Sequence, residues 1–224
     1  MSAIFGIVSC DVVDSTFLDG DALFQLREDI HSGLFPDIES LCPGFWGRVV
    51  RGDTIECCLE RPMLSFQVAF LIKCWFKDWA SRHDASDDMR KSGVRYSIGI
   101  GPMRLVDRRL DYMDGKAIYL AGRNLDYISE RKIPSFFEMD SDAKDVNTLI
   151  RNNIRLIDWM VEHATERQIP ILYGRLMEKS EGTIARELSM TQSAINQRAG
   201  NAGWPLIRDT LRILEQVDFK KYVV

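Results

Sequence analysis

The chain has 224 residues, of which 46% are hydrophobic and 28% are charged, and its formal net charge is −4. This composition is typical of a globular protein, and no apolar run reaches the roughly 18 residues that a membrane span needs. The negative charge argues against a protein coated in nucleic acid. Residues 146–224 nevertheless carry 11 Lys and Arg against 9 Asp and Glu, a net +2, which allows a local contact with DNA.

The cysteines and the N-terminus indicate a cytoplasmic protein. The number of cysteines is odd and none forms a CxxC pair, so we expect buried free thiols in a reducing compartment. The first residues lack the basic and apolar stretches of a secretory signal. The cysteines are Cys10, Cys42, Cys57, Cys58 and Cys74.

The first strand and helix are predicted by their hydrophobic patterns. Residues 3–11 are almost continuously apolar, which predicts a strand buried on both faces. Residues 20–34 repeat apolar side chains at helical spacing. Pro36 and the cluster Cys42-Pro43-Gly44 are expected to end this helix.

A hairpin and a long helix follow. Residues 45–50 and 54–60 predict two strands joined by a tight turn at Arg51-Gly52, where glycine supplies the unusual backbone angle. From Pro62, a long segment of helical periodicity extends to about His83.

Residues 84–93 are expected to be a polar linker. The segments that follow predict a strand over 94–106, a helix over 114–131 and a final strand over 132–139. The order β-α-β-β-α-β-α-β favours an α+β sandwich with its helices on one face of a mainly antiparallel sheet, a ferredoxin-like or palm arrangement.

The strand signals stop after about Asp145, and only helical patterns follow. We therefore predict two domains, an α+β domain over 1–145 and a helical domain over 146–224. The helices of the second domain are predicted over 146–168, 169–180, 181–189, 191–203 and 204–217.

Two carboxylates are expected to meet at one edge of the predicted sheet. Asp11 ends the first strand and Asp53 lies in the hairpin turn. Two carboxylates a few ångströms apart repel, so one of them takes up a proton unless a cation lies between them. Mg²⁺ binds one or two carboxylates together with substrate phosphates and water, so we predict a Mg²⁺ site here.

The segment after Asp11 is a candidate phosphate-binding loop. Backbone N–H groups of Val12, Val13, Asp14, Ser15 and Thr16 can face phosphate oxygens where the next helix begins. The alternative is structural. Asp14, Ser15 or Thr16 can cap that helix, and an aspartate after glycine, such as Asp53, is a common turn residue.

Four segments resemble landmarks of the class III nucleotidyl cyclases. They are "DVVDST" after the first strand, "VVRGDTIECCL" in the hairpin, "VRYSIGIGPM" and "DGKAIYLAGRNLD". This resemblance implies that Asp11 and Asp53 hold metal and that Arg123 steadies the reacting phosphates. Tyr119 stands where the family has an asparagine, and Val49 stands where adenylyl cyclases have a lysine. Tyr119 is instead a candidate to stack on a nucleotide base.

The same segments together with "TIARELSMTQSAINQR" resemble the SatD-like bacterial family over nearly the whole chain. That resemblance implies a cyclase-like body joined to a C-terminal helix-turn-helix. It implies the architecture more than any particular reaction.

The helix-turn-helix is also predicted from the residues themselves. Ser180 and Thr191 are helix caps, Ser189-Met190 is the turn, and Ala185 and Ile195 are buried packing positions. The second helix then exposes polar side chains that can contact bases or phosphates. These candidate DNA-binding residues are Thr191, Gln192, Ser193, Asn196, Gln197 and Arg198.

Three functions agree with these patterns. The first is a nucleotide- or phosphate-binding regulatory protein that binds DNA through its helix-turn-helix, and a homodimer of it would match a palindromic site. The second is a Mg²⁺-dependent nucleotidyl cyclase or nucleotidyltransferase. The third is a structural or interaction protein with vestigial sites.

Trp159/Met160 and Leu206/Leu211/Ile213 are candidate dimer surfaces, with core packing as the alternative.

Overall fold

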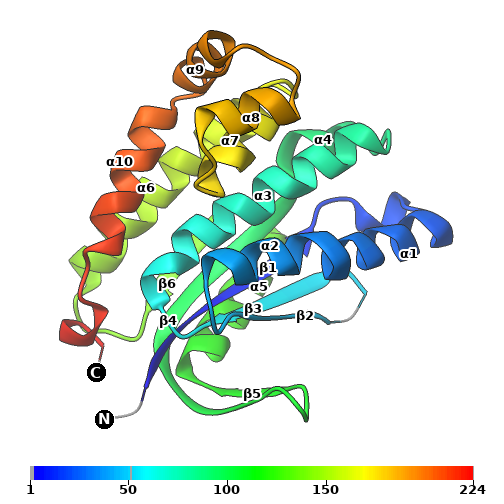
Figure 1. Ribbon diagram of the computed structural model, residues 1–224. Helices are drawn as coiled ribbons and strands as arrows, with labels where there is room; N and C mark the ends of the chain where they lie inside the picture. Colours follow the sequence, from blue (N-terminus) through cyan, green and yellow to red (C-terminus); the bar gives the residue numbers. More distant parts are fainter. Residues whose placement is uncertain (1–2, 51, 224) are drawn as a thin grey trace.

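The computed structural model describes residues 3–50 and 52–223, and shows a sheet covered by helices and followed by a group of C-terminal helices (Figure 1). The order β2-β3-β1-β4 is antiparallel throughout, as in a ferredoxin-like βαββαβ unit. β5 extends this order beside β4, and β6 pairs with β4 in parallel. The predicted α+β class is confirmed. The strands are β1 (Ile4–Val12), β2 (Trp46–Val50), β3 (Thr54–Leu59), β4 (Val94–Asp107), β5 (Tyr112–Gly115) and β6 (Ser135–Met139).

The helices of this part differ from the prediction in two places. Pro36 does not end the first helix, because it lies in the first turn of α2, where its missing N–H costs nothing, after a π-helical turn over Ile30–Leu34. The expected linker over 84–93 contains α4, whose N-terminus is capped by the Ser86 hydroxyl. The helices are α1 (Gly20–Asp29), α2 (Phe35–Leu41), α3 (Ser65–Arg82), α4 (Asp87–Ser92) and α5 (Lys116–Arg131).

The helices cover both faces of the sheet, so the prediction of helices on one face is wrong. Val8 of β1 belongs to the large hydrophobic cluster that contains α3, whereas Ile7 packs with Ala117 and Ala121 of α5. Successive residues of a strand point to opposite faces, so β1 is buried on both. Gly99 makes this possible, because a Cβ atom there would lie 2.3 Å from the Ala117 carbonyl oxygen.

The C-terminal helices pack against α3, which covers one face of the sheet. Ile154 and Leu172 belong to the same hydrophobic cluster as Val8, so one core extends across position 145. A division into two domains at that position stays a prediction. The helices are α6 (Lys144–His163), α7 (Ile169–Leu176), α8 (Glu181–Glu187), α9 (Gln192–Asn201) and α10 (Trp204–Glu215).

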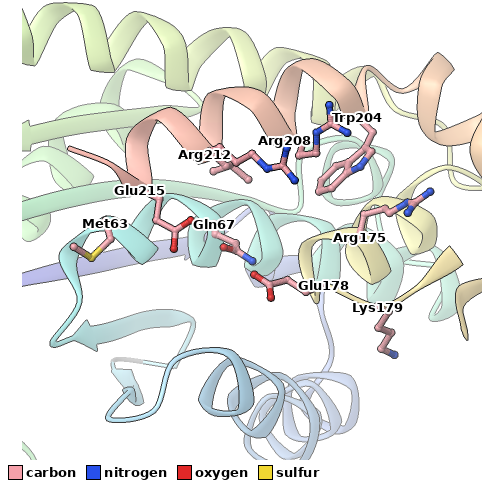
Figure 2. Close-up of a pocket in the computed structure, with 10 residues that line it drawn as sticks. Met63, Gln67, Arg175, Glu178, Lys179, Trp204, Arg208, Arg212 and Glu215 are labelled. Carbon is pink, nitrogen blue, oxygen red and sulfur yellow. The ribbon is translucent and has the colours of Figure 1, made fainter.

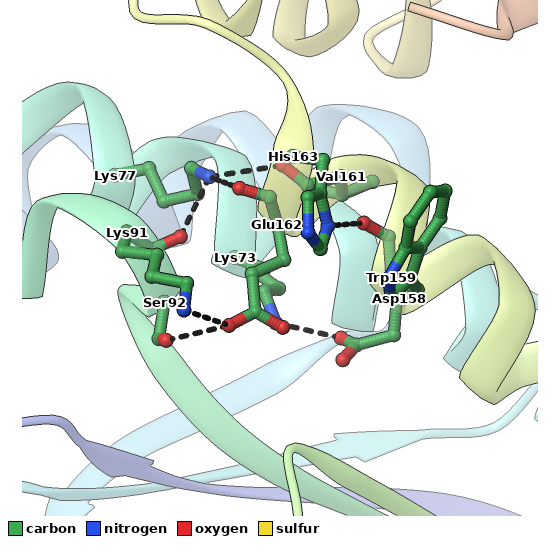
Figure 3. A network of polar contacts seen from close by, with 9 residues as sticks. All are labelled: Lys73, Lys77, Lys91, Ser92, Asp158, Trp159, Val161, Glu162 and His163. Atoms are coloured by element: carbon green, nitrogen blue, oxygen red, sulfur yellow. Dashed lines mark hydrogen bonds and ion pairs between the residues drawn. The ribbon is translucent and has the colours of Figure 1, made fainter. Parts of the chain in front are cut away.

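Two lysines of α3, one helical turn apart, attach α6 to the rest of the protein (Figure 3). Lys73 forms a 2.8 Å ion pair with Asp158, and both side chains are fully buried. Lys77 donates hydrogen bonds to the carbonyl oxygens of Val161, Glu162 and Lys91. These carbonyls lie in the last turns of α6 and α4, where a cation is favourable. Burial nevertheless lowers the pKa of Lys77 to about 8.

The cysteines are buried free thiols, as predicted. In the part of the chain that the structure describes, no helix is both long and apolar enough to cross a membrane.

We predict that Asp158→Asn destabilises the protein by about 3–5 kcal/mol, because it leaves the Lys73 ammonium buried without a counter-charge. The double variant Lys73→Met/Asp158→Leu should recover most of this loss, since it removes both charges. Urea unfolding at pH 7 measures both values. Arg82→Gln is the control, because the exposed Arg82–Asp78 pair should contribute less than about 1 kcal/mol. A double variant as unstable as Asp158→Asn would contradict the prediction.

Candidate functional site

The Asp11 carboxylate lies at the end of the central strand β1. In the sheet register Asp11 is opposite Thr54 of β3 and opposite Arg95 of β4. Its Oδ2 accepts a hydrogen bond of 3.3 Å from the Ser129 hydroxyl of α5 and lies 3.6 Å from the Arg95 guanidinium. The Arg95 contact follows from the strand register, but no local sequence signal indicated Ser129.

The hairpin turn brings Asp53 to the end of the sheet at which Asp11 lies. Gly52 has a φ of 88°, the backbone angle that the sequence predicted for this turn, and Arg51 lies outside the described residues. Asp53 Oδ2 accepts a hydrogen bond from the Ser15 hydroxyl, which follows β1. Asp53 is also close enough to Asp11 for its charge to raise the pKa of the Asp11 carboxyl.

The carboxylate pair has the chemistry of a divalent-cation site. Burial, followed by the charge of Asp53, raises the pKa of Asp11 above its usual value. Within the described residues, the hydrogen bonds from Ser15 and Ser129 engage Oδ2 of Asp53 and Asp11, which leaves Oδ1 of each carboxylate for a cation. Among residues 3–50 and 52–223, no third His, Cys, Asp or Glu completes a metal cluster. Two carboxylates suit Mg²⁺, which takes its remaining ligands from phosphate and water.

The segment after Asp11 is only partly available to a ligand. The side chains of Val12 and Val13 are buried, and the Val13 N–H donates to the Gly93 carbonyl. Asp14 has a φ of 56° and accepts a hydrogen bond from Ser86, so its side chain does not cap the next helix. Asp19 performs that role, since its carboxylate accepts the Ala22 N–H of α1 at 2.8 Å. The phosphate-binding prediction therefore rests on residues 14–16.

Tyr119 and Arg123 lie together, but away from the two carboxylates. The Arg123 guanidinium lies 5.5 Å from the centre of the Tyr119 ring and pairs with Glu138 at 2.8 Å. Both side chains are on α5, where Ser129 marks the end nearest Asp11. At about 1.5 Å per residue, Tyr119 is about 15 Å along the helix from Ser129. One chain thus does not bring Tyr119 to Asp11, and Arg123 is held away from Asp11 by its ion pair with Glu138.

α8 and α9 are two short helices joined by a tight turn, the arrangement in which a helix-turn-helix was predicted. Ser180 and Thr191 cap the two helices through their hydroxyls, and Ser189 in the turn has a φ of 52°. Ala185 and Ile195 are buried between the helices and α7, as predicted.

The polar face of α9 is exposed, although Asn196 on this face is hydrogen-bonded to other side chains of the protein. Thr191, Gln192, Ser193 and Gln197 are exposed, and Arg198 is half-buried. The Asn196 amide donates to Glu181 at 2.7 Å, and its oxygen accepts from Arg175 at 2.8 Å.

Only some residues of the candidate dimer surfaces are exposed. Trp159, Leu206 and Ile213 are more than half exposed, whereas Met160 and Leu211 pack against the core.

Solved cyclase structures are similar to this chain in fold. A bacterial light-regulated adenylyl cyclase is 14% identical, with 61% of this chain and 76% of that chain covered and a TM-score of 0.40. An adenylate/guanylate cyclase/hydrolase from Silicibacter pomeroyi is 21% identical, with coverages of 56% and 70% and a TM-score of 0.35. The guanylyl cyclase Cya2 is 13% identical, with coverages of 57% and 73% and a TM-score of 0.38.

These values describe a distant likeness of fold and assign no role to any residue. No protein-family model and no curated protein matches the chain, so membership of the SatD-like family stays a prediction.

We predict that Asp11→Asn stabilises the metal-free protein at pH 7 by up to about 1 kcal/mol. The raised pKa of Asp11 means that its contribution to stability is present at low pH and is lost as the pH rises through the folded-state pKa. At pH 7 the ionised pair therefore opposes folding, and the neutral amide removes that repulsion.

Thermal unfolding in EDTA between pH 3 and pH 8 measures the effect. The melting temperatures of wild type and Asp11→Asn should converge towards the acid end, where Asp11 is protonated. Asp126→Asn on the exposed side of α5 is the matched control. A variant that is less stable than wild type at pH 7 would contradict the prediction.

Proposed function

We propose that the α+β part binds a nucleotide or a related phosphate ligand together with Mg²⁺ at Asp11 and Asp53. The observation that carries this proposal is the part-buried pair of carboxylates that β1 and the hairpin bring to one end of the sheet. Burial, and then the charge of Asp53, raise the pKa of Asp11. Such a pair opposes folding unless a cation compensates it.

Phosphate is the ligand chemistry that fits this edge best. Mg²⁺ held by Asp11 and Asp53 would supply positive charge to phosphate oxygens. Arg95 beside Asp11 and the exposed Thr16 after β1 are the polar groups that a phosphate would meet there. Arg123, paired with Glu138, has a role at this site only after that pair opens.

We infer DNA binding as the function of α8 and α9. The support is the exposed row of Thr191, Gln192, Ser193 and Gln197 on a helix whose other face is buried against α7 and α8. Glutamine can make paired hydrogen bonds to adenine in the major groove. Together the two sites describe a ligand-sensitive transcription regulator.

We expect titration calorimetry with a panel of nucleoside triphosphates in Mg²⁺ to show binding that Asp53→Ala weakens at least about 10-fold, since about 1.4 kcal/mol of metal-mediated binding corresponds to that factor. Asp19→Asn is the matched control, because asparagine preserves the helix cap of α1. Absence of binding by every nucleotide would favour vestigial sites. Pyrophosphate release that is lost in Asp11→Ala would favour the cyclase or nucleotidyltransferase instead.

We expect Gln197→Ala to weaken binding to a DNA duplex selected from a random library by about 10-fold or more, because a good contact to a base contributes about 1–3 kcal/mol of discrimination. Fluorescence anisotropy at fixed salt measures this, with Gln216→Ala after α10 as the control. Equal affinity of the two variants, or failure of the wild-type chain to select any sequence, would refute specific DNA reading by α9.

A further inference from the structure

A cavity of about 500 Å³ lies between α10, the start of α3 and the end of α7 (Figure 2). Its volume is within the range of about 300–1,000 Å³ that is usual for small-molecule sites. It contains neither Asp11 nor Asp53. Its walls combine an indole ring with several charged groups.

The α10 wall presents an aromatic ring beside two cations. Trp204, Arg208 and Arg212 are spaced four residues apart, so they lie along one side of the helix and point towards the cavity in Figure 2. The Arg208 guanidinium also forms an ion pair with its neighbour Asp209. A planar ring next to guanidinium groups is suited to a flat aromatic group that carries a negative charge.

The opposite wall offers hydrogen-bonding groups. Gln67 of α3 and Glu178 after α7 face Arg208 and Arg212 across the cavity in Figure 2, and Glu215 lies at one end. Carboxylate and amide oxygens accept hydrogen bonds from amino groups, which a nucleobase carries and a simple aromatic acid lacks.

Arg175 connects this cavity to the helix-turn-helix. Arg175 lines the cavity, and its guanidinium reaches away from it to bind Glu181 of α8 at 2.7 Å and Asn196 of α9 at 2.8 Å. Its Nε–H is buried and has no hydrogen-bond partner in the described structure. Buried polar groups are nearly always satisfied, so this unpaired donor makes the present conformation of Arg175 costly and easier for a ligand to displace.

We propose that the cavity is a second, metal-independent site for a nucleotide with an amino-bearing base, and that its occupancy acts on α9 through Arg175. The base stacks on Trp204 and bonds to Gln67 and Glu178, while the phosphate pairs with Arg208 and Arg212. A ligand acceptor at the Arg175 guanidinium competes with the bond that it donates to the Asn196 side-chain oxygen, and so weakens the attachment of α9 to α7.

The test uses the full chain in EDTA, so that the Asp11–Asp53 site holds no cation, with AMP, adenosine and inorganic phosphate as separate probes. We expect AMP to quench tryptophan fluorescence and bind more tightly than either fragment. Arg212→Gln should weaken AMP binding about 10-fold, as expected for the loss of one charge-assisted hydrogen bond. Arg155→Gln, an exposed arginine of α6, is the matched control and should bind like wild type.

The coupling is tested by NMR of the side-chain amide of Asn196. We expect AMP to shift its resonances in wild type and in Asp53→Ala, but not in Arg212→Gln at the same AMP concentration. Absence of AMP binding in EDTA, or equal binding by Arg212→Gln and Arg155→Gln, would overturn the site. Binding that leaves the Asn196 resonances unmoved would overturn the link to α9. Since the AMP response is also expected in Asp53→Ala, a negative result at this cavity is distinguishable from a negative result at the Mg²⁺ site.

Discussion

The buried ion pair between Lys73 and Asp158 determines how the two parts of the chain fit together. Two unit charges with no solvent exposure cannot be separated without leaving each uncompensated in the core, so α6 has one favourable position on α3. Lys77, one turn further along α3, binds the last carbonyls of α6 and α4 and fixes the same register again. α7 and α10 also pack on α3, beside this anchor.

At Asp11 and Asp53, charges of the same sign lie together, unlike in the Lys73–Asp158 pair. At α6 a carboxylate is buried with its counter-ion, whereas at the end of β1 two carboxylates lie close together and the Arg95 guanidinium is 3.6 Å from Asp11. An arrangement that opposes folding and is still built by the central strand is typical of a functional site. The closeness of two part-buried carboxylates is the main physical reason to propose ligand binding at this end of the sheet.

Local patterns in the sequence predicted the elements well, while packing between distant elements was predicted poorly. The hairpin turn at Gly52 and the caps Ser180 and Thr191 depend on neighbouring residues, and the structure contains all three. The position of α5 on the second face depends on how closely Gly99 lets a helix approach, which no local pattern encodes. For the same reason the pairing of Arg123 with Glu138, through a strand 15 residues away, could not be anticipated.

DNA binding by α8 and α9 has an electrostatic constraint of its own. Within residues 180–203, Arg186 and Arg198 balance Glu181 and Glu187, so one copy of this unit has no net charge. Affinity for duplex DNA rises with the number of phosphates that a protein neutralises, so a single neutral unit binds weakly. Two copies on adjacent half-sites would double the contacts, which makes a homodimer the form in which the predicted DNA binding is strongest. The exposed apolar side chains of α6 and α10 stay the predicted surface for such a dimer.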